Sequence, residues 1–251
     1  MINVLICGIS GETGKRIYLT TKKYENLNVV CGVDKNFNSN IEFDCPVYAD
    51  FDQVKEMVDV IINFSTPEAL PSLLEFAKEN NCAIVEGTTG YTQKQKDSIY
   101  DAGKALPIFI PTNVSPGINV LRKLCVLASQ TLGNFDIEII EEYKANKLNA
   151  PSMTSKMLAE AINLAFNGDK KVSYGRKGIG ERPENEICIH SVRGGNISGK
   201  TQILFIGEGE TITITHEVHH RTLFAQGACD VACFIMNKPA GIYNIEDFFK
   251  E

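Results

Sequence analysis

The first 34 residues constrain the fold of this chain more than any other stretch. An apolar run ends in Gly8-Ile-Ser-Gly11-Glu-Thr-Gly14, and a second apolar run, residues 29–33, ends on Asp34. The glycines let a backbone turn tightly and approach a pyrophosphate, and the helix that follows offers free N–H groups and a partial positive charge. An acid at the end of the second strand accepts hydrogen bonds from a ribose. The pattern therefore predicts a strand, a turn, a helix and a strand that together bind a dinucleotide.

The spacing of the turn is G-x-x-G-x-x-G, so Ser10 stands where the commoner fingerprint has its middle glycine. The alternative is an ordinary turn between a strand and a helix. Because strand, helix, second strand and acid occur in the expected order, we favour nucleotide binding. The expected nucleotide contacts of this turn are Gly8, Ile9, Ser10, Gly11, Glu12 and Thr13.

Composition excludes several function classes. The net charge of −6, without a basic run, argues against a nucleic-acid partner. No apolar stretch approaches the roughly 20 residues that a membrane span needs. The eight cysteines form no C-x-x-C pair and several lie within apolar patterns, which is typical of buried thiols in a reducing compartment. The chain starts directly in a strand pattern without a secretion signal, so we expect a cytoplasmic protein.

Up to residue 114 the chain alternates short apolar strands with helices. The strands are expected at 2–7, 28–33, 59–64, 83–86 and 107–110, and the helices at about 12–24, 50–57, 67–79, 93–104 and 116–132. This alternation predicts a doubly wound parallel sheet of the Rossmann type, in which ligands bind at the carboxyl ends of the strands. Gly87-Thr-Thr-Gly90 follows such a strand end and suits a nicotinamide ribose, although a simple tight loop is the alternative.

After residue 134 the pattern changes to that of an α+β domain with a mixed or antiparallel sheet. We expect strands at 135–141, 186–192, 200–206 and 211–219, a helix over 152–166, and a loop over 167–185. A last apolar helix, 223–236, is expected to pack back on the first domain. The predicted division is a dinucleotide-binding domain, 1–114, completed by 222–251, and a substrate-binding and oligomerisation domain, 115–221.

The polar chemistry of the second domain is concentrated in residues 136–156. Lys144 and Lys147 follow a strand, and Ala-Pro-Ser152-Met-Thr154 then opens a helix. Two cations, two hydroxyls and the free N–H groups of a helix start are suited to an anion, and to a small dicarboxylate better than to a phosphate. The alternative is a capped helix after a solvated loop.

These residues carry a resemblance to a known family. The shared elements are the Gly8–Gly14 turn, Gly87-Thr-Thr-Gly90, Asn113-Val-Ser-Pro-Gly-Ile-Asn119, Asp136-Ile-Glu-Ile-Ile-Glu141, Lys147-x-x-Ala-Pro-Ser-x-Thr154, His190-Ser-Val-Arg-Gly-Gly195 and Arg221-x-x-Phe-Ala-x-Gly227. With them the chain resembles, over nearly its whole length, the 4-hydroxy-tetrahydrodipicolinate reductase (dihydrodipicolinate reductase) family of diaminopimelate and lysine biosynthesis.

The resemblance implies hydride transfer from NADH or NADPH to an unsaturated cyclic dicarboxylate. It also implies a homotetramer built through the C-terminal sheets. Asp34 suits the ribose hydroxyls of NADH, and Lys35 is placed to meet the extra phosphate of NADPH. The further cofactor contacts implied are Gly87, Thr88, Thr89, Pro111, Thr112, Asn113 and Val114. The substrate contacts implied are Lys144, Ser152, Met153, Thr154 and Arg221.

The chain departs from the family pattern at the expected catalytic loop. Tyr143 and Lys144 stand where the family has a histidine pair, Asn149 replaces an aspartate, and Met153 replaces a glycine whose N–H meets a substrate carboxylate. Gly199-Lys-Thr201 replaces the family's Gly-Glu-His. Tyr143, with Lys147 four residues on, is the expected proton donor, and Lys147 the expected charged catalytic group. The same spacing resembles the short-chain dehydrogenase pair, whose other motifs are missing.

Two alternatives stay open. The first is a nucleotide-binding paralogue with an altered substrate or lost catalysis, because the histidine pair is absent. The second concerns His216-Glu-Val-His219-His220, whose spacing is not that of a metal motif and for which we expect a surface role, with no metal. The alternative for this segment is that His219 or His220 reaches the ligand-binding cleft expected at the carboxyl ends of the parallel strands.

Overall fold

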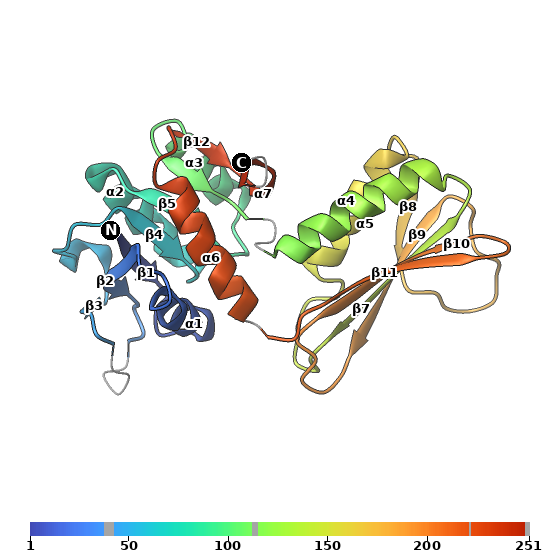
Figure 1. Ribbon diagram of the computed structural model, residues 1–251, viewed down its shortest axis with the longest axis horizontal. Coiled ribbons are helices and arrows are strands. Elements are labelled where there is room, and N and C mark those ends of the chain that lie inside the picture. Colours follow the sequence, from blue (N-terminus) through green and yellow to red (C-terminus); the bar gives the residue numbers. More distant parts are fainter. Residues whose placement is uncertain (38–42, 112–114, 221, 249–251) are drawn as a thin grey trace. The chain divides into compact units, whose positions relative to one another are not determined.

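The computed structural model describes residues 1–37, 43–111, 115–220 and 222–248 (Figure 1). The chain divides into two compact units. The first comprises residues 1–114 together with 222–251, and the second comprises residues 115–221. Each unit is described by itself below.

The first unit is built on a parallel sheet that has seven strands in the described part of the chain, in the order β12-β6-β5-β4-β1-β2-β3. Every neighbouring pair in it is parallel. This confirms the predicted doubly wound class. The strands are β1 (Ile2–Cys7), β2 (Leu27–Val33), β3 (Val47–Tyr48), β4 (Val60–Asn63), β5 (Ala83–Glu86), β6 (Pro107–Phe109) and β12 (Gly241–Tyr243).

Helices cover both faces of this sheet because the central strands are apolar on both sides. On one face, Val4, Ile6 and Ile62 pack with α1 and with the C-terminal helix α6, which lie beside each other (Figure 1). On the other face, Leu5 and Ile61 pack with α2 and α3. The helices are α1 (Glu12–Thr21), α2 (Leu70–Asn80), α3 (Gln93–Ala102), α6 (Thr222–Ile235) and α7 (Ile245–Phe248).

The second unit is a mixed five-stranded sheet, in the order β11-β10-β7-β9-β8, with two helices on one face. β10 pairs antiparallel with β7 and β11, whereas β9 pairs parallel with β7 and β8. Inward-facing Ile137, Ile139, Ile203 and Phe205 form its core with the helices. The elements are α4 (Pro116–Thr131), β7 (Asp136–Tyr143), α5 (Met153–Ala165), β8 (Lys171–Tyr174), β9 (Glu186–Arg193), β10 (Lys200–Ile206) and β11 (Thr211–Glu217).

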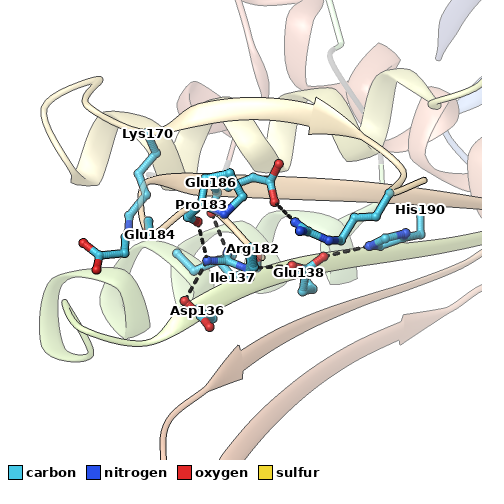
Figure 2. Close-up of polar contacts among 10 residues, drawn as sticks. Asp136, Ile137, Glu138, Lys170, Arg182, Pro183, Glu184, Glu186 and His190 are labelled. Carbon is cyan, nitrogen blue, oxygen red and sulfur yellow. Dashed lines mark hydrogen bonds and ion pairs between the residues drawn. The ribbon is translucent and has the colours of Figure 1, made fainter. Parts of the chain in front are cut away.

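The face of this sheet opposite the helices carries a polar network (Figure 2). Arg182 donates to Glu138 Oε1 over 2.9 Å and to Asp136 Oδ1 over 2.7 Å, and His190 Nε2 lies 2.7 Å from Glu138 Oε2. Arg176 pairs with Glu186 beside them. Alternation along β7 explains the arrangement, because Glu138 points away from the core that Ile137 and Ile139 fill.

The structure corrects the sequence expectation at a few elements. The helix expected over 50–57 is only a 3₁₀ turn, Phe51–Gln53, because Val54 is already extended after it. The expected loop 167–185 contains the edge strand β8. Two further short edge strands, β3 and β12, have no alternating pattern of useful length, so the sequence did not indicate them.

Candidate active site

The turn after β1 has the close backbone contacts that its glycines predict. Gly8 has φ +81°, and a Cβ there would lie 2.5 Å from the carbonyl oxygen of Phe64. A Cβ on Gly14 would lie 2.1 Å from the carbonyl oxygen of Gly8. A side chain at either position would push the turn apart, so the backbone path depends on both glycines.

The start of α1 offers groups that a phosphate needs. Gly11 is its N-cap, without a side-chain cap, so the first N–H groups of the helix remain available to an anion. The Ser10 hydroxyl is buried and has no hydrogen-bond partner among the described residues. These features fit a bound nucleotide, whose phosphate oxygens would accept hydrogen bonds from the first N–H groups of α1 and from the Ser10 hydroxyl. Ile9 has a fully buried side chain, so only its backbone faces the turn.

Asp34 is held at the end of β2 next to this turn. Its carboxylate accepts the backbone N–H of Ser10 over 3.0 Å and that of Asn36 over 3.0 Å. The acid therefore helps to set the shape of the turn. Lys35 follows it and is exposed, and Glu12 is exposed and paired with Arg16 over 3.2 Å.

The loops after β4 and β5 lie beside the turn. The Phe64 ring lies against Gly87, where a Cβ would come within 2.3 Å of the ring. Thr88 Oγ1 accepts the N–H of Ser65 over 3.0 Å, which joins the two loops. Thr89 is exposed, and Pro111 after β6 is half-buried. Of the remaining expected cofactor contacts, Thr112, Asn113 and Val114 lie outside the described residues.

In the second unit, the expected anion site is the start of α5. Ser152 is the N-cap, as the sequence predicted, and its hydroxyl accepts the N–H of Ser155 over 3.1 Å. Met153 opens the helix with its side chain 63% exposed. Thr154 and Lys144 are half-buried. Arg221, the remaining expected substrate contact, lies outside the described residues.

A carboxylate that the sequence argument did not assign organises this site. Glu141 is fully buried and accepts four hydrogen bonds, from Ser152 N (2.8 Å), Ser155 Oγ (2.6 Å), Ser191 Oγ (2.8 Å) and Arg193 Nη2 (2.6 Å). Burial alone would raise its pKa, but the hydrogen bonds from Ser152, Ser155 and Arg193 outweigh burial and hold the pKa at about 2. Glu141 therefore stays ionised and fixes the start of α5 to β7 and β9.

Arg193 extends this anchor to the loop before the helix. Its Nη2 also donates to the carbonyl oxygen of Asn149 over 2.8 Å. Its guanidinium carbon lies 5.5 Å from the centre of the Tyr143 ring. The loop that carries Lys147 is thus tied to the same carboxylate network as the helix.

Tyr143 and Lys147 are close, as the proposed proton donor requires. Residues 144–147 form a turn, in which Lys147 N–H donates to Lys144 O over 3.1 Å. The helix that would have brought the two side chains together is absent from this described segment, yet Lys147 Nζ lies 4.7 Å from the centre of the Tyr143 ring. The ring also packs on Gly199, where a Cβ would lie 2.8 Å from Tyr143 Cε1.

The histidines near the end of the second unit have a structural explanation. His216 Nε2 lies 3.3 Å from Ser115 Oγ, and its ring packs on Gly117 at the start of α4. Burial lowers the pKa of His216, which favours the neutral ring. His219 and His220 are exposed. The one group of three possible metal ligands among the described residues is Glu138, Cys188 and His190, whose carboxylate Arg182 already binds.

A doubly wound unit with a glycine turn, followed by an α+β unit with a capped helix start, is typical of a two-part oxidoreductase. The chain belongs to the dihydrodipicolinate reductase family, whose N-terminal model matches residues 2–114 and whose C-terminal model matches residues 117–249. Members of this family use a pyridine nucleotide. No described helix has the length and apolar character needed to cross a bilayer.

Relatives of known name align along the whole chain. The 4-hydroxy-tetrahydrodipicolinate reductase of Caldanaerobacter subterraneus subsp. tengcongensis is 40% identical, covering 100% of this chain and 99% of the relative. That of Clostridium novyi is 36% identical with the same coverage. A dipicolinate-bound dihydrodipicolinate reductase from Paenisporosarcina sp. TG-14 superposes with a TM-score of 0.80 at 28% identity, covering 98% of this chain and 99% of that one.

The Glu141 anchor leads to a prediction about stability and pH. The folded-state pKa of Glu141 lies below the unfolded value, so the unfolded chain binds more protons and wild-type stability falls as pH drops from about 4.5 towards about 2. Glu141→Gln removes this contribution and is expected to lower the free energy of unfolding by about 2–3 kcal/mol near neutral pH. Urea unfolding across pH measures both effects.

Glu160→Gln is the matched control, because Glu160 lies exposed on α5. It is expected to change the free energy of unfolding by less than about 0.5 kcal/mol and to lose stability at acid pH as wild type does. A Glu141→Gln protein as stable as this control would show that the carboxylate does not hold the site together.

Proposed function

We propose that this chain reduces 4-hydroxy-tetrahydrodipicolinate to tetrahydrodipicolinate with NADH or NADPH, in diaminopimelate and lysine biosynthesis. The observation that carries the proposal is the Glu141-anchored loop with Lys147, Ser152 and Thr154, in a chain 40% identical to a reductase of that name. The relatives are named for this reaction, and the residues that the family resemblance implies for it, Lys147, Ser152 and Thr154, are present here.

The nucleotide is assigned to the first unit. Gly8 to Thr13 receive the pyrophosphate through backbone N–H groups, and the unsatisfied Ser10 hydroxyl supplies a further donor. Asp34 receives the ribose hydroxyls of NADH, whereas the exposed Lys35 meets the extra phosphate of NADPH. Use of both cofactors follows from having both side chains at the end of β2. Gly87, Thr88, Thr89 and the segment 111–114 are assigned to the nicotinamide half.

The substrate is assigned to the second unit. Its two carboxylates meet Lys144, the Thr154 hydroxyl, the N–H of Met153 and Arg221. The buried Ser152 hydroxyl caps α5 and holds this helix start in place. The solvent-directed Met153 side chain leaves its backbone N–H at the first turn of α5, which is the group that the family's glycine offers. The change from glycine to methionine is therefore compatible with carboxylate binding.

The 4-hydroxyl group leaves as water together with a hydrogen of the neighbouring ring carbon, which produces a conjugated imine. This imine then takes up one hydride and one proton. The bound nicotinamide supplies the hydride. We assign the proton to the Tyr143 hydroxyl, because the Lys147 and Arg193 side chains lie beside its ring. Lys147 also offers positive charge to the electron pair that moves onto the substrate.

The alternative function, a nucleotide-binding paralogue without this reaction, rests on the replaced histidine pair alone. A coupled assay separates the two. The upstream synthase generates the substrate, and loss of reduced nicotinamide absorbance follows the reaction. Turnover by wild type supports the reductase, whereas nucleotide binding without turnover supports the paralogue.

We further propose a cytoplasmic homotetramer. Ile140, Leu204 and Ile206 lie on the open face of the second unit's sheet, and beside them the Arg182 network leaves its charges paired. Such a face suits contact with the same face of a second copy. The eight cysteines are all free, which suits a reducing cytoplasm. Sedimentation equilibrium measures the assembly, and a monomer at micromolar concentration would contradict it.

Lys147 is expected to carry the largest single effect on turnover. Lys147→Ala removes the cation beside Tyr143 and is expected to lower kcat by about 100- to 1,000-fold. The Kd for NADH should stay unchanged, because the nucleotide is assigned to the other unit. Lys156→Ala, an exposed lysine on α5, is the control and should keep wild-type kcat. A loss below about tenfold in Lys147→Ala would move the chemistry elsewhere.

The Tyr143 hydroxyl is tested by the smallest possible change. Tyr143→Phe keeps the ring on Gly199 and under Lys147, so it is expected to fold normally, to bind NADH, and to lose about 100-fold in kcat. The double change Tyr143→His with Lys144→His restores the family's histidine pair. Its kcat should return from the low level of Tyr143→Phe towards that of wild type. Unchanged turnover in Tyr143→Phe would assign the proton to water or to another side chain.

A further inference from the structure

The first unit contains a buried carboxylate that the proposed reaction does not use. Glu86 is the last residue of β5 and is 3% exposed. The Asn63 amide nitrogen donates to both carboxylate oxygens, over 3.0 and 2.9 Å. The N–H of Thr88 donates to one of them over 2.9 Å. Within the described residues, no lysine or arginine pairs with it. A buried acid held by neutral donors is costly, so its presence calls for a role.

The hydrogen bonds of Glu86 reach both loops at this edge of the sheet. Asn63 Oδ1 accepts the Ser65 hydroxyl over 2.6 Å, and Thr88 Oγ1 accepts the Ser65 N–H over 3.0 Å. The Tyr91 hydroxyl lies 3.2 Å from the Asn63 amide nitrogen. Glu86 thus fixes the loop after β4 to the loop after β5.

The two loops also define the position of the nucleotide turn. Gly8 lies against the Phe64 carbonyl, and the Phe64 ring lies against Gly87. Phe64 sits between Asn63 and Ser65, and Gly87 sits between Glu86 and Thr88. A movement of the Glu86 network therefore moves the groups that meet the glycine turn.

Among the described residues, the groups hydrogen-bonded to the Glu86 carboxylate are donors, so this arrangement favours the ionised acid. Protonation of Oε2 would remove one of the two contacts of the Asn63 amide nitrogen, and protonation of Oε1 would also weaken the hydrogen bond from the Thr88 N–H. Burial nevertheless raises the pKa of Glu86, and the hydrogen bonds from Asn63, Thr88 and Tyr91 oppose it only in part. The network consequently has a proton-dependent step.

The neighbouring groups do not change charge near neutral pH. Burial raises the pKa of Cys7, on β1, to about 12. Burial and the Glu86 charge also raise the pKa of Tyr91 above its ordinary value. The helices over this face, α2 and α3, bury apolar Leu70, Leu73 and Ile99 toward the sheet. Of these groups, Glu86 is the one whose pKa is raised from the ordinary carboxyl range towards neutral pH.

We propose that Glu86 is a proton-linked positioning residue for the nicotinamide nucleotide: as a carboxylate it holds Ser65 and Thr88 in the geometry that receives the cofactor, and its protonation releases them. The inference rests on the proposed nucleotide site at Gly8 to Thr13. Because binding favours the ionised acid, the Kd for NADH rises as pH falls through the pKa of Glu86, by at most about tenfold per pH unit.

The experiment titrates NADH fluorescence from about pH 8 to about pH 5, with each mixture read at once because NADH decomposes in acid. Three single variants accompany wild type. Glu86→Gln places an amide NH₂ against donors and is expected to weaken binding about tenfold at the alkaline end and to remove the pH dependence. Glu75→Gln, an exposed acid on α2, is the matched control and should reproduce wild type.

Tyr91→Phe keeps Glu86 but removes a hydroxyl whose hydrogen bond lowers the pKa of that acid. Its binding profile should keep the wild-type shape with the midpoint moved to higher pH. A merely structural role for the network would change the affinity without moving this midpoint. Thermal melts of each variant at both ends of the pH range report folding independently of the nucleotide.

The outcomes separate the two proposals. Absence of NADH binding by folded wild type at every pH overturns the nucleotide function itself. Wild-type binding with an identical Kd and profile in Glu86→Gln overturns the role of Glu86 alone. If Glu86→Gln does not fold, the Tyr91→Phe midpoint decides, and an unshifted midpoint overturns the inference.

Discussion

The second unit depends on one fully buried carboxylate. Glu141 gathers donors from the start of α5 and from β9, so the helix, the sheet and the loop before the helix share a single ionic centre. A charge buried in this way is tolerated only while all its donors are in place. The cationic loop that carries Lys147 is therefore positioned by a residue that need not meet the substrate. The chemistry at the loop is free to vary while the anchor keeps its geometry.

The first unit uses backbone contact for the same purpose. Gly8, Gly14 and Gly87 each bring main chain or a ring so close that a methyl group would not fit. Such contacts fix the glycine turn without any charge, and Asp34 and Glu86 then add hydrogen bonds from the ends of β2 and β5. Both units thus use acids on or just after a strand to hold a loop. Asp34 and Glu86 lie beside glycines in the first unit, and Glu141 is bound by serines in the second.

Much of this was available from the sequence because it depends on local pattern. The spacing of apolar residues and the positions of turn residues predicted the doubly wound sheet, the mixed second sheet and the Ser152 cap. Glu141 and Glu86 were not assigned because their roles depend on distant partners: Arg193 lies 52 positions from Glu141, and Asn63 lies 23 from Glu86. In a sequence, an acid at the end of an apolar strand does not reveal which donors the fold brings to it. The strand β8 was missed for a related reason, since an edge strand in a charged, glycine-rich segment has no apolar alternation.

The path of the chain has a consequence for the order of folding during synthesis. The first unit is discontinuous: α6 covers one face of its sheet and β12 pairs with β6, yet both follow the whole second unit in the sequence. On the ribosome, the second unit is complete while Val4, Ile6 and Ile62 still lack the helix that covers them. The nascent first unit therefore displays an apolar sheet face and an open strand edge until the last segment emerges. Residues 222–251 therefore complete the first unit only after the second unit has been synthesised.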